Sequence, residues 1–188
     1  DLVNEFASKN KLIDPVVLEV GCGAGHVLHA INSKVKTKNL IGLDPLDDWR
    51  DLAYKRLDGK VKLIKGFAED LPFEDESIDC LVCSEVLEHI IDPSIALDEF
   101  KRVLKKDGLM IISIPNETII DFLKDIINLF KVYNLLFPNI QKENEWHIHD
   151  FDLKLFNQYL PADLKTLSIK SIPNALLPLR YVIALKKI

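Results

Sequence analysis

The sequence predicts one α/β domain with a mainly parallel sheet, and the alternation of two kinds of segment and the chain length support this prediction. Short apolar runs rich in β-branched residues alternate with segments of helical periodicity, as expected where helices connect parallel strands. Strand-like runs occupy residues 16–20, 39–43, 61–66, 78–83 and 108–114, and helical patterns lie near residues 2–10, 25–34, 47–57 and 93–105. The chain has 188 residues, about the length of one domain, so we expect a single domain over residues 1–188.

The helical segment near residues 93–105 carries start and stop signals. Asp92 precedes Pro93, a combination favoured at a helix N-cap and first turn. At the other end, two lysines and an aspartate precede Gly108. Cations in a last turn followed by glycine are typical of a helix end, so we expect this helix to stop there.

The C-terminal strands follow a different pattern. Residues 164–172 and 179–187 have strand character and are separated by only a short connection. A parallel crossover needs about a dozen residues or more, so these two strands are expected to form an antiparallel hairpin.

A helical excursion is expected over residues 116–160, between the parallel strands and the hairpin. Its residues 118–137 hold 13 apolar residues among seven polar ones, which recur every three or four positions. This spacing predicts an amphipathic helix, continuous or broken. We expect it to cover the core or the mouth of a functional site; a partner interface and peripheral membrane contact are the alternatives. Asn116, at its start, is a candidate either for lining that site or for forming a turn.

Composition and charge exclude several function classes. The net charge of −5 offers no basic field for nucleic acid. The longest hydrophobic run has five residues, 181–185, far below the roughly 20 of a membrane-spanning helix. The first residues lack the basic and apolar parts of a signal peptide, although residue 1 is not Met, so residues can be missing upstream. We expect a cytoplasmic protein.

Cys80 and Cys83 form a C-x-x-C pattern inside a predicted buried strand. Side chains three positions apart on a strand point to opposite faces, and no second thiol pair completes a metal site. We therefore expect buried, reduced thiols.

A glycine-rich turn is the most informative stretch of the sequence. A buried strand leads into glycines at positions 21, 23 and 25, and a helix follows. Glycines let a ligand approach the backbone, and the helix N-terminus offers free N–H groups. The dinucleotide fingerprint needs a glycine where His26 stands, which disfavours a nicotinamide oxidoreductase. The carboxylate of Glu19 repels a pyrophosphate and attracts an ammonium group, so we expect a ligand with a positive amine.

Asp44 ends the second predicted strand, 19 residues after Gly25. This distance is close to the roughly 20 residues expected for an acid that binds ribose hydroxyls. The alternative is a helix-capping role before Pro45. After the glycine turn we favour ribose binding.

Residues 18–25 resemble motif I of the class I S-adenosylmethionine-dependent methyltransferases, and residues 41–44 resemble their acidic second motif. The later stretches 69–73, 77–79, 84–89 and 104–109 resemble downstream blocks of the small-molecule branch that includes ubiquinone- and menaquinone-biosynthesis enzymes. The resemblance implies a Rossmann-like seven-stranded, mostly parallel sheet with an antiparallel last strand and helices on both faces. It also implies S-adenosylmethionine as the cofactor and an unidentified small-molecule acceptor. A cofactor-binding, non-catalytic subunit that acts through its amphipathic helix is the alternative.

The resemblance also implies individual roles in cofactor binding. The residues assigned to the methionine part are Glu19, Gly21, Cys22, Gly23 and Gly25, and Asp44 is assigned to the ribose. Leu46, Ala68 and Glu69 are assigned to the adenine, and Ser84 and Glu85 to the methionyl chain and the sulfonium. Many relatives have an acid that binds the adenine amine where this chain has Phe67. Adenine recognition is then expected to use backbone groups, Glu69 or stacking.

Methyl transfer from a sulfonium is an in-line displacement, so the protein mainly aligns the reactants and excludes water. A general base is needed only for a weakly acidic hydroxyl or a protonated amine acceptor, and His89, His147 and His149 are the candidates. The His-x-His pair can also be half of a metal site, but no supporting acidic cluster is evident and we expect no metal. Alternatively His147 lies on the surface, and His149 with Asp150 caps a helix that begins near residue 152.

Overall fold

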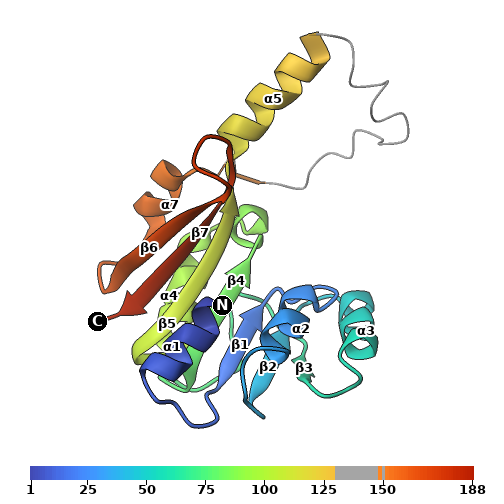
Figure 1. Cartoon of the computed structure of the whole chain (residues 1–188), viewed down its shortest axis with the longest axis vertical. Helices are drawn as coiled ribbons and strands as arrows, with labels where there is room; N and C mark the ends of the chain where they lie inside the picture. The colour runs from blue at the N-terminus through green and yellow to red at the C-terminus, as the bar shows by residue number, and fades with distance from the viewer. Residues whose placement is uncertain (130–147, 150) are drawn as a thin grey trace.

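The computed structural model describes residues 1–129, 148–149 and 151–188. Within this part of the chain, seven strands form one sheet in the order β3-β2-β1-β4-β5-β7-β6 (Figure 1). The strands are β1 (Val17–Val20), β2 (Leu40–Leu43), β3 (Lys62–Ile64), β4 (Ile78–Ser84), β5 (Leu104–Pro115), β6 (Leu164–Pro173) and β7 (Pro178–Lys187). Strands β1 to β5 are parallel, and β7 is antiparallel to both of its neighbours. The predicted mostly parallel sheet with an antiparallel last strand is confirmed.

Helices cover both faces of this sheet, as predicted. They are α1 (Leu2–Lys9), α2 (His26–Asn32), α3 (Asp47–Arg56), the 3-10 helix η1 (Leu87–His89), α4 (Pro93–Val103), α5 (Glu117–Leu129) and α7 (Leu153–Tyr159). One core cluster contains Leu28 of α2 and Ala53 of α3, and the other contains Phe100 of α4 and Phe156 of α7. We refer to the two sides of the sheet as the α2 face and the α4 face.

The two cysteines of β4 lie on opposite faces of the sheet. Cys80 belongs to the core on the α2 face and Cys83 to the core on the α4 face, and both thiols are free. Burial raises the pKa of Cys80 to about 12 and that of Cys83 well above its ordinary value. The thiolate, which is the reactive form, is therefore suppressed, and the prediction of buried, reduced thiols is confirmed.

Helix α4 begins as predicted and ends earlier than predicted. The Asp92 side chain accepts a hydrogen bond from the Ser94 N–H at 3.0 Å. The helix stops at Val103, before the two lysines and the glycine. Leu104 already pairs with Ile78 of β4, and Lys105 Nζ lies 2.9 Å from Asp79 Oδ1. Pairing with the neighbouring strand thus outweighs the local helix-stop signal.

Asn116 joins the end of β5 to the start of β7. Its backbone N–H donates to the Leu179 carbonyl at 2.9 Å, and its Nδ2 donates to the Pro178 carbonyl at 2.8 Å and to Tyr181 Oη at 3.0 Å. The side-chain amide therefore anchors the C-terminal hairpin, which agrees with the turn-forming alternative.

Helix α5 follows β5 directly and extends away from the sheet, beyond the carboxyl ends of the parallel strands (Figure 1). It confirms the start of the amphipathic helix predicted over residues 118–137. Residues 130–137 lie outside the described residues, so the cover formed by residues 116–160 stays a prediction. Among the described residues, no helix has the length and apolar character to cross a membrane.

Candidate functional site

The glycine turn lies between β1 and α2, where the backbone takes a path that favours glycine. Gly21, Gly23 and Gly25 have φ values of 69°, 48° and 76°, in the left-handed region. A Cβ placed on Gly21 meets Val86 Cγ2 at 2.2 Å, so the chain after β4 packs directly on the turn. A Cβ placed on Gly23 meets no described atom within 4 Å. The turn is therefore open at Gly23, where a ligand can contact the backbone.

Asp44 connects the glycine turn to the start of α3. Its Oδ2 accepts a hydrogen bond from the Gly23 N–H and its Oδ1 accepts one from the Leu46 N–H, both at 2.9 Å. The side chain thus holds the backbone of the glycine turn and of the residues before α3. The helix-capping alternative is wrong, because the N-cap of α3 is Leu46 and no side chain caps that helix. Each carboxylate oxygen keeps a second lone pair, so the same group can also accept hydrogen bonds from hydroxyls.

Glu19 has an unusual environment for a carboxylate. Its residue is 2% exposed, and Oε2 has no hydrogen-bond partner among the described residues. Burial raises the pKa of Glu19 to about 8; a backbone hydrogen bond from Leu28 opposes the shift, and the charge of Asp44 adds to it. Buried polar atoms are normally hydrogen-bonded. An ammonium group bound at the glycine turn supplies a partner of the right charge, so the site fits the amino group of S-adenosylmethionine.

A chain of polar side chains crosses the carboxyl ends of β4, β5 and β7. Ser113 Oγ donates to Glu85 Oε1 at 2.7 Å and lies 2.8 Å from Ser84 Oγ, so the Ser84 hydroxyl is the donor of that second bond. Arg180 Nη2 lies 3.0 Å from Glu85 Oε2. Glu85 has a φ of 55°, which is uncommon for a residue with a Cβ and occurs often at functional sites.

Sequence reasoning identified Ser84 and Glu85 but missed Ser113 and Arg180. Neither missed residue belongs to a recognisable motif. Each contacts Glu85 directly, but from a different strand and from a position far away in the sequence. Arg180 was detectable only as a cation in the first, mainly apolar part of a hairpin strand that ends in two lysines.

The three positions expected at the adenine differ in what they present. Leu46 is 56% exposed, just after β2, and Glu69 is partly exposed. Ala68 is buried in the core on the α4 face, so its side chain is not available to a ligand. Phe67, which replaces the usual acid, is 60% exposed after β3. The ends of β2 and β3 therefore present two apolar side chains, Leu46 and Phe67, that a planar ring can contact.

The structure brings the segment of His149 next to that of His89. The Ile148 N–H donates to the Glu88 carbonyl at 2.8 Å, and His149 Nε2 lies 3.0 Å from the Ile91 carbonyl oxygen. The His149 ring also packs edge-on against Phe151, with 5.8 Å between ring centroids. His147 lies outside the described residues.

The alternative in which His149 with Asp150 caps helix α7 is contradicted, although Asp150 itself lies outside the described residues. The cap is Asp152, whose Oδ1 accepts a hydrogen bond from the Leu155 N–H at 2.7 Å. An aspartate at the N-cap position reaches this N–H directly, so no other side chain is needed. Within the described ranges, no group of three or more His, Cys, Asp or Glu side chains is arranged to hold a metal ion.

Comparison with known proteins places the same region in a family. A family model described as a methyltransferase domain matches residues 18–112. The ubiquinone/menaquinone biosynthesis C-methyltransferase of Campylobacter jejuni is 30% identical over 104 residues, which cover 53% of this chain and 44% of the relative. The demethylmenaquinone methyltransferase of Staphylococcus aureus is 28% identical over 137 residues, covering 69% of this chain and 57% of the relative. The chain thus spans about half the length of these relatives.

Solved structures share the fold. A SAM-dependent methyltransferase from Aquifex aeolicus has a TM-score of 0.65 at 15% identity, with 98% of this chain and 89% of that chain covered. The PH0226 protein from Pyrococcus horikoshii has a TM-score of 0.69 at 17% identity, with 100% and 90% covered.

Proposed function

Since this chain belongs to the class I S-adenosylmethionine-dependent methyltransferases, we propose that it transfers the methyl group of S-adenosylmethionine to a small-molecule acceptor by in-line displacement. The observation that carries the proposal is the buried carboxylate of Glu19, whose Oε2 has no partner among the described residues, next to a glycine turn that is open at Gly23. Three free, buried cysteines support a reducing, cytoplasmic location as part of the same proposal.

Each part of the cofactor is proposed to bind near the carboxyl end of a different strand. Glu19 binds the ammonium group, and the backbone of the glycine turn contacts the methionine part. Asp44 accepts hydrogen bonds from the ribose hydroxyls, and Leu46 and Phe67 flank the adenine. When bound, S-adenosylmethionine supplies a methyl group already activated on a sulfonium.

The acceptor is expected to react near Ser84 and Glu85, at the carboxyl end of β4. Alignment of the nucleophile and exclusion of water are the main tasks of the protein there. Residues 116–160 are proposed to contribute to the cover of this region. His89, His147 and His149 stay candidates for a general base, which a hydroxyl or protonated amine acceptor requires.

Isothermal titration of the full chain with S-adenosylhomocysteine tests the proposed function. We expect heat from binding at one site per chain, and S-adenosylmethionine should compete for that site. Absence of both heat and competition at about millimolar ligand contradicts the proposal, because family members must bind their cofactor to act.

Replacing Asp44 by alanine should weaken S-adenosylhomocysteine binding by roughly 1–3 kcal/mol, because hydrogen bonds to a charged group are lost. Since Asp44 also accepts from the Gly23 and Leu46 N–H groups, a lower melting temperature should accompany the weaker binding. Asp51→Ala is the control, because Asp51 is exposed on α3. Unchanged affinity in Asp44→Ala shows that Asp44 only holds these two backbone N–H groups.

A further inference from the structure

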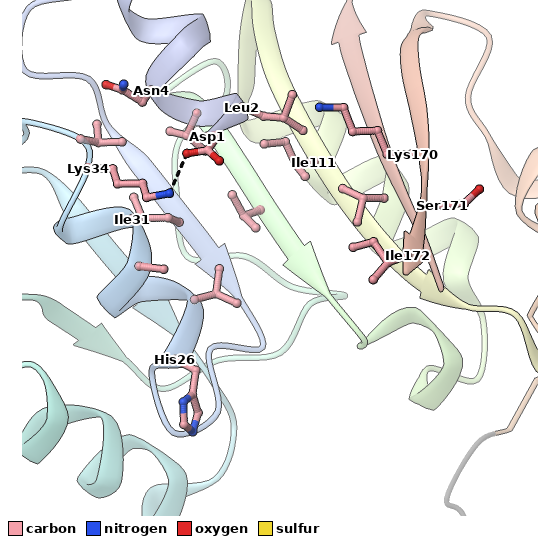
Figure 2. Close-up of a pocket in the computed structure, with 16 residues that line it drawn as sticks. Asp1, Leu2, Asn4, His26, Ile31, Lys34, Ile111, Lys170, Ser171 and Ile172 are labelled. Carbon is pink, nitrogen blue, oxygen red and sulfur yellow. Dashed lines mark hydrogen bonds and ion pairs between the residues drawn. The ribbon is translucent and has the colours of Figure 1, made fainter. Parts of the chain in front are cut away.

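A second feature of the α2 face is a cavity of about 560 Å³ bounded by α1, α2 and strands β4, β5, β7 and β6 (Figure 2). Its walls are mainly apolar and include Leu2, Val27, Ile31, Val82, Ile111 and Val182. His26, the residue after Gly25, lines one end of it. The volume lies within the range of about 300–1,000 Å³ that is usual for small-molecule sites.

Strand register places this cavity directly beside the polar chain of Ser84 and Ser113. Val82 and Ile111 line the cavity, and Ser84 and Ser113 follow each of them by two positions, so all four lie on the same face. Ser84 and Ser113 do not line the cavity themselves; each lies one same-face position, about 7 Å, beyond a lining residue, toward the carboxyl ends of the strands.

The residues that pair with Ser84 across neighbouring strands form a row that continues to β6, at the edge of the sheet. Ser113 pairs with Val182 of β7, and Val182 pairs with Lys170 of β6. From Ser84 on β4 to Lys170 the row crosses three strand spacings, which amounts to about 14 Å. Lys170 thus lines the cavity at the β6 edge, and the hydroxyls of Ser84 and Ser113 lie just beyond its lining at the β4 side.

The charges around the cavity are unevenly compensated. Lys34 Nζ lies 2.6 Å from Asp1 Oδ1, and Arg180 is paired with Glu85. Lys170 makes no ion pair among the residues that the structure describes, and Figure 2 shows its side chain among the cavity residues of β6. An uncompensated ammonium beside an apolar wall favours an anion at that end.

We propose that this cavity holds the methyl acceptor, and that the acceptor is an elongated apolar molecule with an anionic end. Its reacting end lies at Ser84 and Glu85, its apolar body lies along Val82, Ile111 and Val182, and its anion pairs with Lys170. This inference rests on the proposed function and names the acceptor class for it.

Decanoate is the probe that tests the proposal, compared with the neutral 1-decanol and the cationic decyltrimethylammonium. Each is titrated calorimetrically into the full chain in the presence of S-adenosylhomocysteine. We expect decanoate to bind roughly two- to fivefold more tightly than the other two, as one exposed charge pair allows. Lys170→Met should abolish this preference, and Lys165→Met, on the same strand outside the cavity lining, should retain it.

A second pair of variants tests the place of binding. Ala30 is an exposed residue of α2 that lines the cavity, so Ala30→Trp fills the space without disturbing the core. We expect decanoate affinity to fall roughly tenfold or more. His29→Trp changes the adjacent exposed residue, which does not line the cavity, and should leave the affinity unchanged.

Three results overturn the inference. The first is equal affinity for the three probes. The second is a decanoate affinity that neither Lys170→Met nor Ala30→Trp changes. The third is a dimer, detected by sedimentation velocity, that Ala30→Trp dissociates. Titration of S-adenosylhomocysteine alone separates this inference from the proposed function. Intact cofactor binding with failed decanoate binding refutes only the acceptor class, and failed cofactor binding refutes the function.

Discussion

Glu19→Gln is expected to weaken S-adenosylmethionine binding by about 2–3 kcal/mol, because glutamine is isosteric but carries no charge to pair with the ammonium group. The same change should raise the free energy of unfolding of the ligand-free protein near pH 8 by about 1 kcal/mol or more. Calorimetric titration measures the first effect, and urea denaturation at several pH values measures the second.

The pH dependence of stability follows from the raised pKa of Glu19. The folded, ligand-free protein holds the Glu19 proton up to about pH 8, whereas the unfolded chain releases it near the ordinary value of 4.5. Between these values the folded state binds more protons, so stability falls as pH rises through this window. Glu19→Gln should remove that slope and have little effect on stability below pH 4.5.

Glu74→Gln is the matched control, since Glu74 is exposed and far in sequence from the glycine turn. It should change neither the cofactor affinity nor the slope of stability with pH. If Glu19→Gln binds S-adenosylmethionine with unchanged affinity, Glu19 is not the partner of the ammonium group. The unpartnered Oε2 of Glu19 then no longer supports the proposed function.

Gly23→Ala should reduce cofactor affinity by about 2–3 kcal/mol, roughly a hundredfold, because the new methyl group occupies the space that the cofactor needs. Its effect on folding should be only about 1–2 kcal/mol, the cost of the left-handed backbone, since the added Cβ meets no described atom within 4 Å. Binding is measured by calorimetry and folding by thermal denaturation.

Variants of two other glycines distinguish the effect of backbone strain from the effect of a methyl group that fills the ligand site. Gly59→Ala imposes similar strain at a φ of 65°, and the three atoms nearest its Cβ belong to the exposed Tyr54 side chain, so cofactor binding should be retained. Gly21→Ala places its Cβ 2.2 Å from Val86 Cγ2 and should destabilise the fold more than Gly23→Ala. Equal cofactor affinity in Gly23→Ala and Gly59→Ala contradicts a ligand site at Gly23.

Local patterns were sufficient for most elements of the sheet. The seven predicted strands are all present, because each apolar run is bounded by turn residues and buries its side chains in one or both cores. The antiparallel hairpin was predictable because a short connection excludes a parallel crossover. The end of α4 was not, since pairing of Leu104 with Ile78 depends on a strand that lies far away in the sequence.

The sequence by itself determined the fold class, the glycine turn and the two acids that flank it, because a turn, a strand end and their spacing are local properties of the chain. Only the tertiary structure decided that Asp44 also holds the Gly23 N–H and that Glu19 Oε2 is buried without a partner among the described residues. It alone brought Arg180 to Glu85 and aligned Ser84, Ser113 and Lys170 beside one cavity. These contacts arise from the insertion of β7 between β5 and β6, and cross-strand register, which no local pattern records, sets which side chains then meet.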